Sequence, residues 1–305
     1  MKEKSLQLIK VYYTICECKD NRLFNAYQRL SPNSSPKFTD LEVITSLLFA
    51  FLEGQANSIK QSYNFIKDYW ISWFPDLPSY QTYNYRLNKL KDVLQSIISY
   101  LIKNSIKYFS LHSQITLLLD SMPVIMASGR RKPKVAPDLN QKGYNASKKM
   151  FYYRVKLHTL AIRQKGTIPF PFMIGITPAN THDLIAVEET LVQSQELKGT
   201  LIFADKAYVD ASFTEKLNHN NCKLYAPDKI KKGEAEINKL RDASAHKMKG
   251  SFIAHHRQPI ESFFNWIIEK FNIQNGAKIR SRDGIFVHIY TRLIAALLIA
   301  PISNS

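Results

Sequence analysis

The sequence predicts an α/β protein in which a mixed sheet flanked by helices follows an all-helical N-terminal region. Apolar residues recur at helical spacing through the first ~110 residues, and short apolar runs typical of strands begin soon after. From there, strands and helices follow in the order strand, strand, strand, helix, strand, helix, strand, helix. We therefore expect a helical region over 1–110 and a second domain over 111–305, a division that the length of 305 residues allows.

Each helix of the N-terminal region has its own local signal. Thr39 and Glu42 form a capping box before an apolar helix over 41–52. A second helical pattern covers 59–70, and two prolines then break the chain. Ser79 is placed to cap a long helix that continues through Ile98.

Two helices, a proline-marked turn and a polar helix start are typical of a helix-turn-helix. The last helix begins with side chains that can reach base edges and phosphates, among them Gln81, Asn84 and Arg86. A helical bundle with a solvated polar face explains the same pattern. The net positive charge favours DNA binding.

The second domain has the element order of an RNase H-like fold, in which an antiparallel hairpin precedes alternating strands and helices. A polar, charged segment over 227–250 is expected to be an insertion or a flexible loop. The predicted strands cover 115–119, 152–162, 168–176, 201–204 and 223–225, and the predicted helices cover 183–195, 213–219, 259–270 and 285–300.

The charge balance points to a polyanionic partner. Lys and Arg total 42 against 25 Asp and Glu, which gives a net charge of +17 and a pI of about 9.6. Nucleic acid is the commonest cellular polyanion, and no amphipathic basic helix, lipidation signal or spanning apolar run indicates a membrane. Three cysteines without framework spacing indicate a reducing compartment, so we expect a cytoplasmic protein.

Three carboxylates are candidates for a single site. Asp120 and Asp205 each follow a short apolar run, where ligand sites gather in α/β sheets. Glu261 lies in the first turn of an otherwise apolar helix, where an unpaired carboxylate is costly. Such an oxygen-rich set suits two Mg²⁺ ions, with Mn²⁺ able to substitute, and such a pair catalyses in-line phosphoryl transfer.

Each carboxylate also has a purely structural explanation. Asp120 can begin a turn, Asp205 can cap a helix, and Glu261 can complement a helix dipole. The order Asp, Asp, Glu, with each residue at its expected element, favours a shared catalytic role.

The sequence around these residues resembles a known family, the bacterial insertion-sequence transposases of the DDE class. Segments 119–123, 203–208 and 257–264 resemble the two Asp motifs and the Glu motif of that family, and segments 143–149 and 177–183 are similar to its flanking regions. The resemblance covers roughly 80–300. The 56 residues from Asp205 to Glu261 leave no room for a large inserted domain.

The Glu motif departs from the family pattern. Arg257 matches its arginine, but Ala254 and Ile268 stand where many relatives carry Tyr and Lys, and Lys270 follows two residues later. These departures put in doubt how DNA phosphates are held near Glu261 and indicate a divergent branch.

Basic residues near the carboxylates are candidates for phosphate contact. Residues 121–160 hold nine Lys and Arg but one acid; a solvated loop is the alternative explanation. His182 and Asp183 are expected to cap a helix, and His255 and His256 lack a matching pair for zinc. Besides Gln81, Asn84 and Arg86, the candidate DNA-binding residues are Arg130, Arg131, Lys132, Lys134, Lys148, Lys149, Arg154, Lys156, Lys206, Arg257 and Lys270.

The resemblance implies an enzyme that hydrolyses double-stranded DNA at the terminal inverted repeats of its own element and joins the freed 3′-hydroxyls to target DNA. It also implies at least a homodimer in the DNA complex. A metal-dependent nuclease without strand transfer and a non-catalytic repressor derived from a transposase remain as alternatives.

Overall fold

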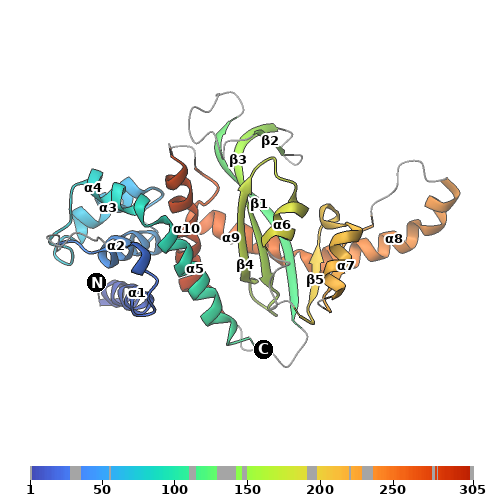
Figure 1. Cartoon of the computed structure of the whole chain (residues 1–305), viewed down its shortest axis with the longest axis horizontal. Coiled ribbons are helices and arrows are strands. Elements are labelled where there is room, and N and C mark those ends of the chain that lie inside the picture. The colour runs from blue at the N-terminus through green and yellow to red at the C-terminus, as the bar shows by residue number, and fades with distance from the viewer. Residues whose placement is uncertain are drawn as a thin grey trace. The chain divides into compact units, whose positions relative to one another are not determined.

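The computed structural model divides the chain into two compact units, each described here by itself (Figure 1). Unit 1 consists of residues 1–104 and 267–300, and unit 2 of 105–266 and 301–305. The structure describes residues 2–27, 36–54, 56–109, 115–128, 142–145, 150–190, 198–219, 221–228, 236–276, 279 and 281–302.

Unit 1 is helical. Its elements are α1 (Lys2–Asp20), η1 (Asn25–Tyr27), α2 (Asp40–Leu52), α3 (Ile59–Tyr69), α4 (Tyr80–Lys89), most of α5 (Lys91–Ile106), the end of α9 (Pro259–Phe271) and α10 (Arg282–Ile299). Helix α2 is apolar on nearly every side, because α1, α3, α4 and α10 all pack against it. The capping box is confirmed: Thr39 N donates to Glu42 Oε2 at 2.7 Å, and Glu42 N donates to Thr39 Oγ1 at 3.3 Å.

Unit 2 contains the sheet. Its strands are β1 (Thr116–Ser128), β2 (Lys142–Asn145), β3 (Met150–Ile162), β4 (Phe170–Pro178), β5 (Leu201–Ala204) and β6 (Lys223–Tyr225), and its helical elements are α6 (Asp183–Thr190), η3 (Lys206–Tyr208), α7 (Ala211–His219), α8 (Glu236–Arg257) and the start of α9.

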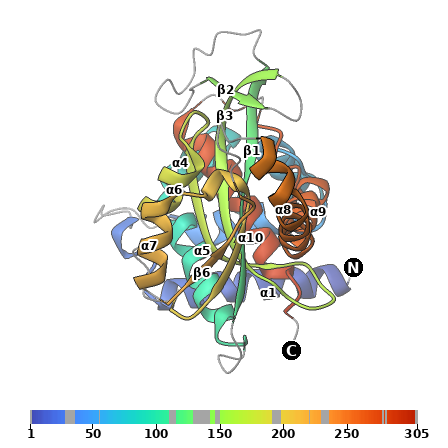
Figure 2. The ribbon, with the colours of Figure 1, turned by 90° about the vertical axis from the view of Figure 1, so that its right-hand side faces the viewer.

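The strand order confirms the predicted fold class. The sheet runs β2-β3-β1-β5-β6, and β4 also pairs with β3. Strand β3 is antiparallel to β1 and β4, whereas β1, β5 and β6 are parallel. This mixed sheet, with α6 and α7 on one side and α8 and α9 on the other (Figure 2), is consistent with an RNase H-like α/β fold.

Proline is tolerated in β4 because this strand lies at an edge and, among the described strands, pairs only with β3. Pro171 pairs with Ala161, next to a register shift in β3. The regular hydrogen bonding between the strands is interrupted there, so a residue without an amide hydrogen fits. Gly166, in the turn between β3 and β4, has a φ of +73°, which glycine adopts without strain.

Three local expectations differ from the structure. The long helix predicted from Ser79 divides at Leu90 into α4 and α5, and both parts bury their apolar residues. Strand β1 does not end before Asp120 but continues to Ser128, because β3 extends the antiparallel ladder alongside it. Within the segment 227–250, residues 236–250 are helical rather than a loop, since they belong to α8.

In the structure, residues 267–300 group with the N-terminal helices in unit 1, because α10 packs on α2 and α4. The division into 1–110 and 111–305 stays a prediction. His288 of α10 is buried, and its Nε2 donates to the Ile273 carbonyl at 2.9 Å. Burial, with a smaller effect of Arg292, lowers the pKa of His288 to about 3.

This histidine should make unit 1 sensitive to acid. The unfolded chain takes up a proton near the ordinary pKa of 6.5, whereas the native protein takes it up only near 3. The free energy of unfolding therefore falls as pH drops from 6.5 toward 3. In denaturant titrations at pH 6.5 and pH 5, His288→Gln should lose roughly 1–2 kcal/mol less than the wild type. The exposed His219→Gln is the control, and an equal loss in all three proteins would contradict the assignment.

Candidate functional site

The two predicted aspartates lie side by side at the centre of the sheet. Strands β1 and β5 pair in parallel up to Leu119 and Ala204, so Asp120 and Asp205 occupy the next position on each strand. Apolar residues precede both carboxylates because these central strands are covered on both faces. Asp205 also caps η3, where its Oδ1 accepts the Lys206 amide at 2.7 Å. The structure thus brings the two aspartates together while leaving the capping role of Asp205 in place.

The junction of α8 and α9 carries Arg257 and Glu261. Helix α8 ends at Arg257, and Pro259 begins α9, a position where its missing amide costs no hydrogen bond. Helix α8 packs against β5, where the His256 ring stacks on Phe203 with ring centroids 5.0 Å apart. This packing fixes the junction beside the strand that precedes Asp205.

Arg257 bridges two of the carboxylates. Its Nη1 donates to Asp120 Oδ2 at 2.5 Å, and its Nη2 donates to Glu261 Oε1 at 2.8 Å. Asp120 Oδ1 accepts the Ser121 amide at 2.8 Å. The Asp120 and Arg257 side chains are about one-fifth exposed, whereas Glu261 is about half exposed. A single guanidinium therefore compensates part of the negative charge of two carboxylates, one on β1 and one on α9.

Burial dominates the electrostatics of Asp120. Desolvation raises the pKa of Asp120 to about 6, against the lowering effects of Arg257 and the Ser121 amide. The negative charges of Asp205, which follows the neighbouring strand, and of Glu261, on the other side of Arg257, raise it further. An ionised Asp120 is thus under-compensated, and such perturbed groups are concentrated at functional sites.

The donor chemistry of the site fits a hard divalent cation, because every candidate ligand atom is a carboxylate oxygen. Among the described residues, no three His, Cys, Asp or Glu side chains are close enough together to hold an ion as they stand. The Arg257 guanidinium lies between Asp120 and Glu261 and occupies the space between their carboxylates. The carboxylates can approach one ion only after that guanidinium moves.

The structure leaves most of the predicted phosphate contacts untested. Lys206 and Lys270 are exposed, as phosphate contact requires, whereas Lys156 Nζ donates to Asp183 at 3.0 Å and to the Thr181 carbonyl at 3.1 Å. The remaining predicted residues of this region lie outside the described residues, or have side chains that do: Arg130, Arg131, Lys132, Lys134, Lys148, Lys149 and Arg154.

The predicted DNA-reading residues of α4 differ in their surroundings. Gln81 is exposed and Asn84 is half-buried. Arg86 donates to both oxygens of Asp40, at 2.6 and 2.5 Å, and to the Tyr27 carbonyl, so its guanidinium is engaged within unit 1.

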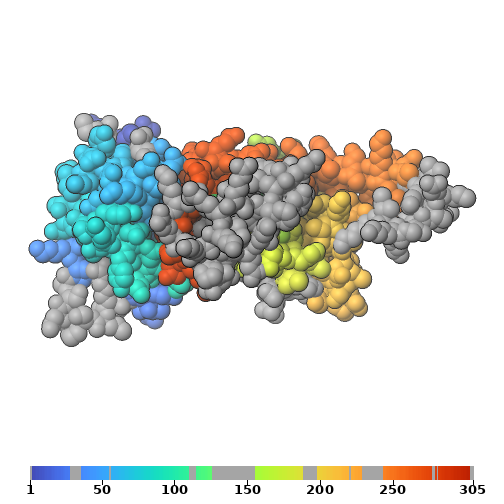
Figure 3. All heavy atoms as spheres, turned by 90° about the horizontal axis from the view of Figure 1, so that it is seen from above, coloured from blue at the N-terminus to red at the C-terminus, as the bar shows by residue number. Residues whose placement is uncertain are grey.

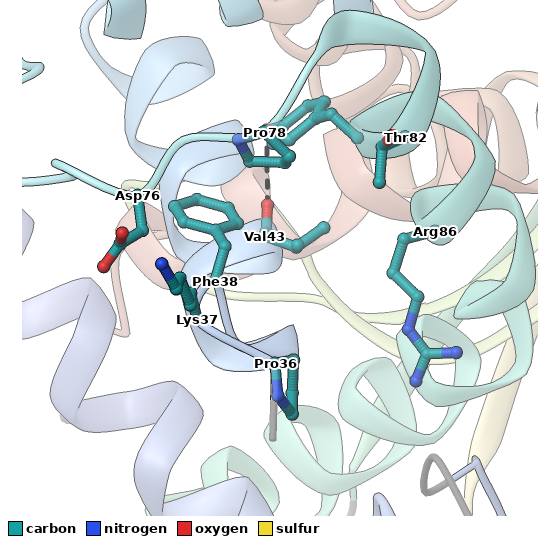
Figure 4. A pocket seen from close by; sticks show the side chains of 9 residues that line it. Pro36, Lys37, Phe38, Val43, Asp76, Pro78, Thr82 and Arg86 are labelled. Atoms are coloured by element: carbon teal, nitrogen blue, oxygen red, sulfur yellow. Dashed lines mark hydrogen bonds between the residues drawn. The ribbon is translucent and has the colours of Figure 1, made fainter. Parts of the chain in front are cut away.

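Beside α4 lies a pocket of about 210 Å³, lined by Phe38, Pro78, Thr82 and Arg86 among others (Figure 4). Tyr83, on the buried side of α4, donates to the Val43 carbonyl at 3.3 Å. The exposed residues of this helix are Gln81, Thr82, Tyr85 and Lys89.

The sequence did not predict a polar cluster behind the aspartates. Of the two residues expected to cap α6, His182 does accept the Leu184 amide through Nδ1 at 3.3 Å. Asp183 instead accepts from Ser121 Oγ at 3.2 Å and from Lys156. One sequence signal could have indicated this cluster: segment 177–183 is similar to a flanking region of the family, but the sequence alone assigned no role to it.

A mixed sheet of this order, with one aspartate on β1, a second directly after the parallel strand β5 and a glutamate on α9, is typical of the RNase H-like class of transposases and nucleases. The family model described as Transposase DDE domain matches residues 112–298. The chain belongs to this family, whose members are generally catalytic and act in DNA transposition.

No curated protein matches the sequence. No helix in the described part of the chain is long and apolar enough to cross a membrane.

The desolvation of Asp120 predicts that removing its charge stabilises the protein. Because its native pKa is raised to about 6, ionisation above that pH costs native stability that the unfolded chain does not lose. We expect Asp120→Asn to raise the free energy of unfolding by roughly 1–3 kcal/mol at pH 8. The gain should shrink as pH falls through 6 toward 4. Urea denaturation tests this, with the exposed Glu215→Gln as control; a destabilised Asp120→Asn at pH 8 would contradict it.

Proposed function

We propose that this chain is a DDE transposase that binds the ends of its own insertion sequence, cleaves the DNA there and joins the 3′-hydroxyl ends to target DNA. The observation that carries the proposal is the meeting of Asp120 and Glu261 at one guanidinium, with Asp205 on the neighbouring strand. These residues lie far apart in the chain, so their convergence is a property of the fold.

Each residue has a proposed task. Asp120 and Asp205 bind metal, and Glu261 completes the site from α9. Two Mg²⁺ ions, or Mn²⁺ in their place, would activate the attacking oxygen and neutralise charge on the scissile phosphate. Partial burial of Asp120, whose side chain is 20% exposed, reduces the screening of its charge by water, which strengthens its attraction to a cation.

Arg257 exchanges partners in this proposal. Without an ion, its guanidinium compensates Asp120 and Glu261. A divalent cation bound by the carboxylates would take over that compensation and repel the arginine. Released, Arg257 is free to donate to a DNA phosphate, for which its planar fork is well suited.

DNA would be held by positive charge from several parts of the chain. The net charge of +17 favours phosphate binding throughout. The basic tract after Asp120 would hold the DNA ends, and the exposed face of α4 with Gln81 would read sequence. Two ends must be joined, so we propose a homodimer in the DNA complex, acting in the cytoplasm on nucleoid DNA.

Removing one carboxylate should abolish chemistry but not DNA binding. We expect Asp205→Asn and Glu261→Gln each to lower the cleavage rate by about 10³-fold, because each loses a negative ligand that binds the cation. Glu215→Gln, the same change on an exposed helix, should retain activity. The assay uses duplexes carrying the DNA that flanks the reading frame, with gel-shift binding measured in parallel.

The same assay distinguishes the alternative functions. Joining of pre-cleaved ends to a second duplex by the wild type supports the transposase. Cleavage without joining would instead identify a nuclease, and binding without either reaction would identify a repressor.

The proposed exchange of Arg257 predicts a separation of metal affinity from activity. Arg257→Gln should bind Mn²⁺ about tenfold more tightly in calorimetry of the DNA-free protein, because no guanidinium competes for the carboxylates. Its cleavage rate should nevertheless fall, since the proposed phosphate contact is lost. Arg163→Gln removes the same charge elsewhere in unit 2 and corrects for long-range electrostatics. Equal Mn²⁺ affinity in the two variants would rule out the exchange.

A further inference from the structure

A second polar cluster lies on the face of the sheet opposite Asp120. Strand residues alternate between faces, so Ser121 projects away from the side on which Asp120 meets Arg257. On that opposite side, Asp183 Oδ1 accepts from Ser121 Oγ at 3.2 Å and from Lys156 Nζ at 3.0 Å. Helix α6, which begins with Asp183, covers this face (Figure 2).

The cluster also reaches the second aspartate. Tyr208 ends η3, the short helix that Asp205 caps, and η3 packs against α6. The Tyr208 hydroxyl is buried and has no hydrogen-bond partner among the described residues. Burial, and to a smaller extent the charge of Asp183, raise the pKa of Tyr208. One acidic side chain therefore lies behind both strands that carry the predicted metal ligands.

The charges in the cluster balance. Asp183 and Lys156 form an ion pair whose side chains are 22% and 18% exposed, so solvent screens it only partly. His158 Nδ1 lies 3.9 Å from Asp183 Oδ1, and burial lowers the pKa of His158 to about 4, so the ring is neutral at pH 7. The one negative charge of the cluster is thus matched by the one positive charge of Lys156.

These contacts do not fit a metal ligand. Asp183 Oδ1 is engaged by a lysine, and Ser121, its link to β1, projects to the face opposite the three carboxylates. The contacts do fit a support, because the hydrogen bond to Ser121 and the packing of η3 on α6 each tie α6 to a backbone segment next to an aspartate. Ser121 directly follows Asp120, and Tyr208 follows Asp205 by three residues.

We propose that Asp183 is a positioning residue that sets the relative placement of Asp120 and Asp205 by holding Ser121 and η3 from the opposite face of the sheet. This inference rests on the proposed function, since it assigns those aspartates to metal binding. It gives a physical role to the segment 177–183. Residues that hold metal ligands in place from behind affect affinity about 10- to 100-fold.

The test separates placement from folding. Ser121→Ala removes the one hydrogen bond between Asp183 and β1 and leaves the ion pair with Lys156 intact. Asp183→Asn keeps the shape but removes the charge. We expect both variants to bind Mn²⁺ about tenfold more weakly than the wild type in calorimetry without DNA. The Mg²⁺ concentration for half-maximal cleavage should rise by a similar factor, while the rate at saturating Mg²⁺ changes less.

The controls keep the outcomes distinguishable. Ser212→Ala, the same change on the exposed start of α7, should bind Mn²⁺ like the wild type. Urea denaturation identifies folded variants, and if Asp183→Asn fails to fold, Ser121→Ala alone decides. Unchanged Mn²⁺ affinity in folded Ser121→Ala would overturn the positioning role while leaving the proposed function intact. Equal Mn²⁺ affinity in Asp205→Asn and the wild type would overturn the proposed function itself.

Discussion

The ion-paired bridge of Arg257 between Asp120 and Glu261 is the interaction on which the arrangement of the site depends. Carboxylates that converge from a strand and a helix repel one another, and burial makes the repulsion stronger. A cation between them makes the convergence tolerable, and the Arg257 guanidinium is such a cation. The raised pKa of Asp120 indicates that its charge is only partly compensated.

The sheet provides rigidity that the carboxylates by themselves lack. Parallel pairing of β1 and β5 fixes the backbone of the two aspartates, and packing of α8 on β5 fixes the helix junction. From the other face, Asp183 connects α6 to Ser121. The two faces thus have different roles in the proposed reaction: one presents the acids, and the other holds their backbones. Figure 3 shows that α8, in orange, lies at the surface of the molecule, where DNA can approach it.

Local signals predicted the elements that have a short-range cause. The capping box at Thr39 and the apolar runs at 201–204 and 223–225 depend on neighbouring residues only, and they appear in the structure where expected. Predictions failed where a distant partner decided. Ser128 belongs to β1 only because β3 lies beside it, and the polar residues 236–250 form a helix despite their loop-like composition.

The amino-acid sequence by itself determined the fold class and the family, and it named the three acids as candidates, because these follow from periodicity and from motifs along the chain. Tertiary structure alone decided which cation lies among the acids, because hydrogen bonds between residues as distant as Asp120 and Arg257 depend on how strands and helices pack. It likewise decided that Asp183 faces Ser121 and Lys156 rather than its own helix end. Side-chain direction is set by the sheet's alternation and by packing across it, neither of which a local pattern encodes.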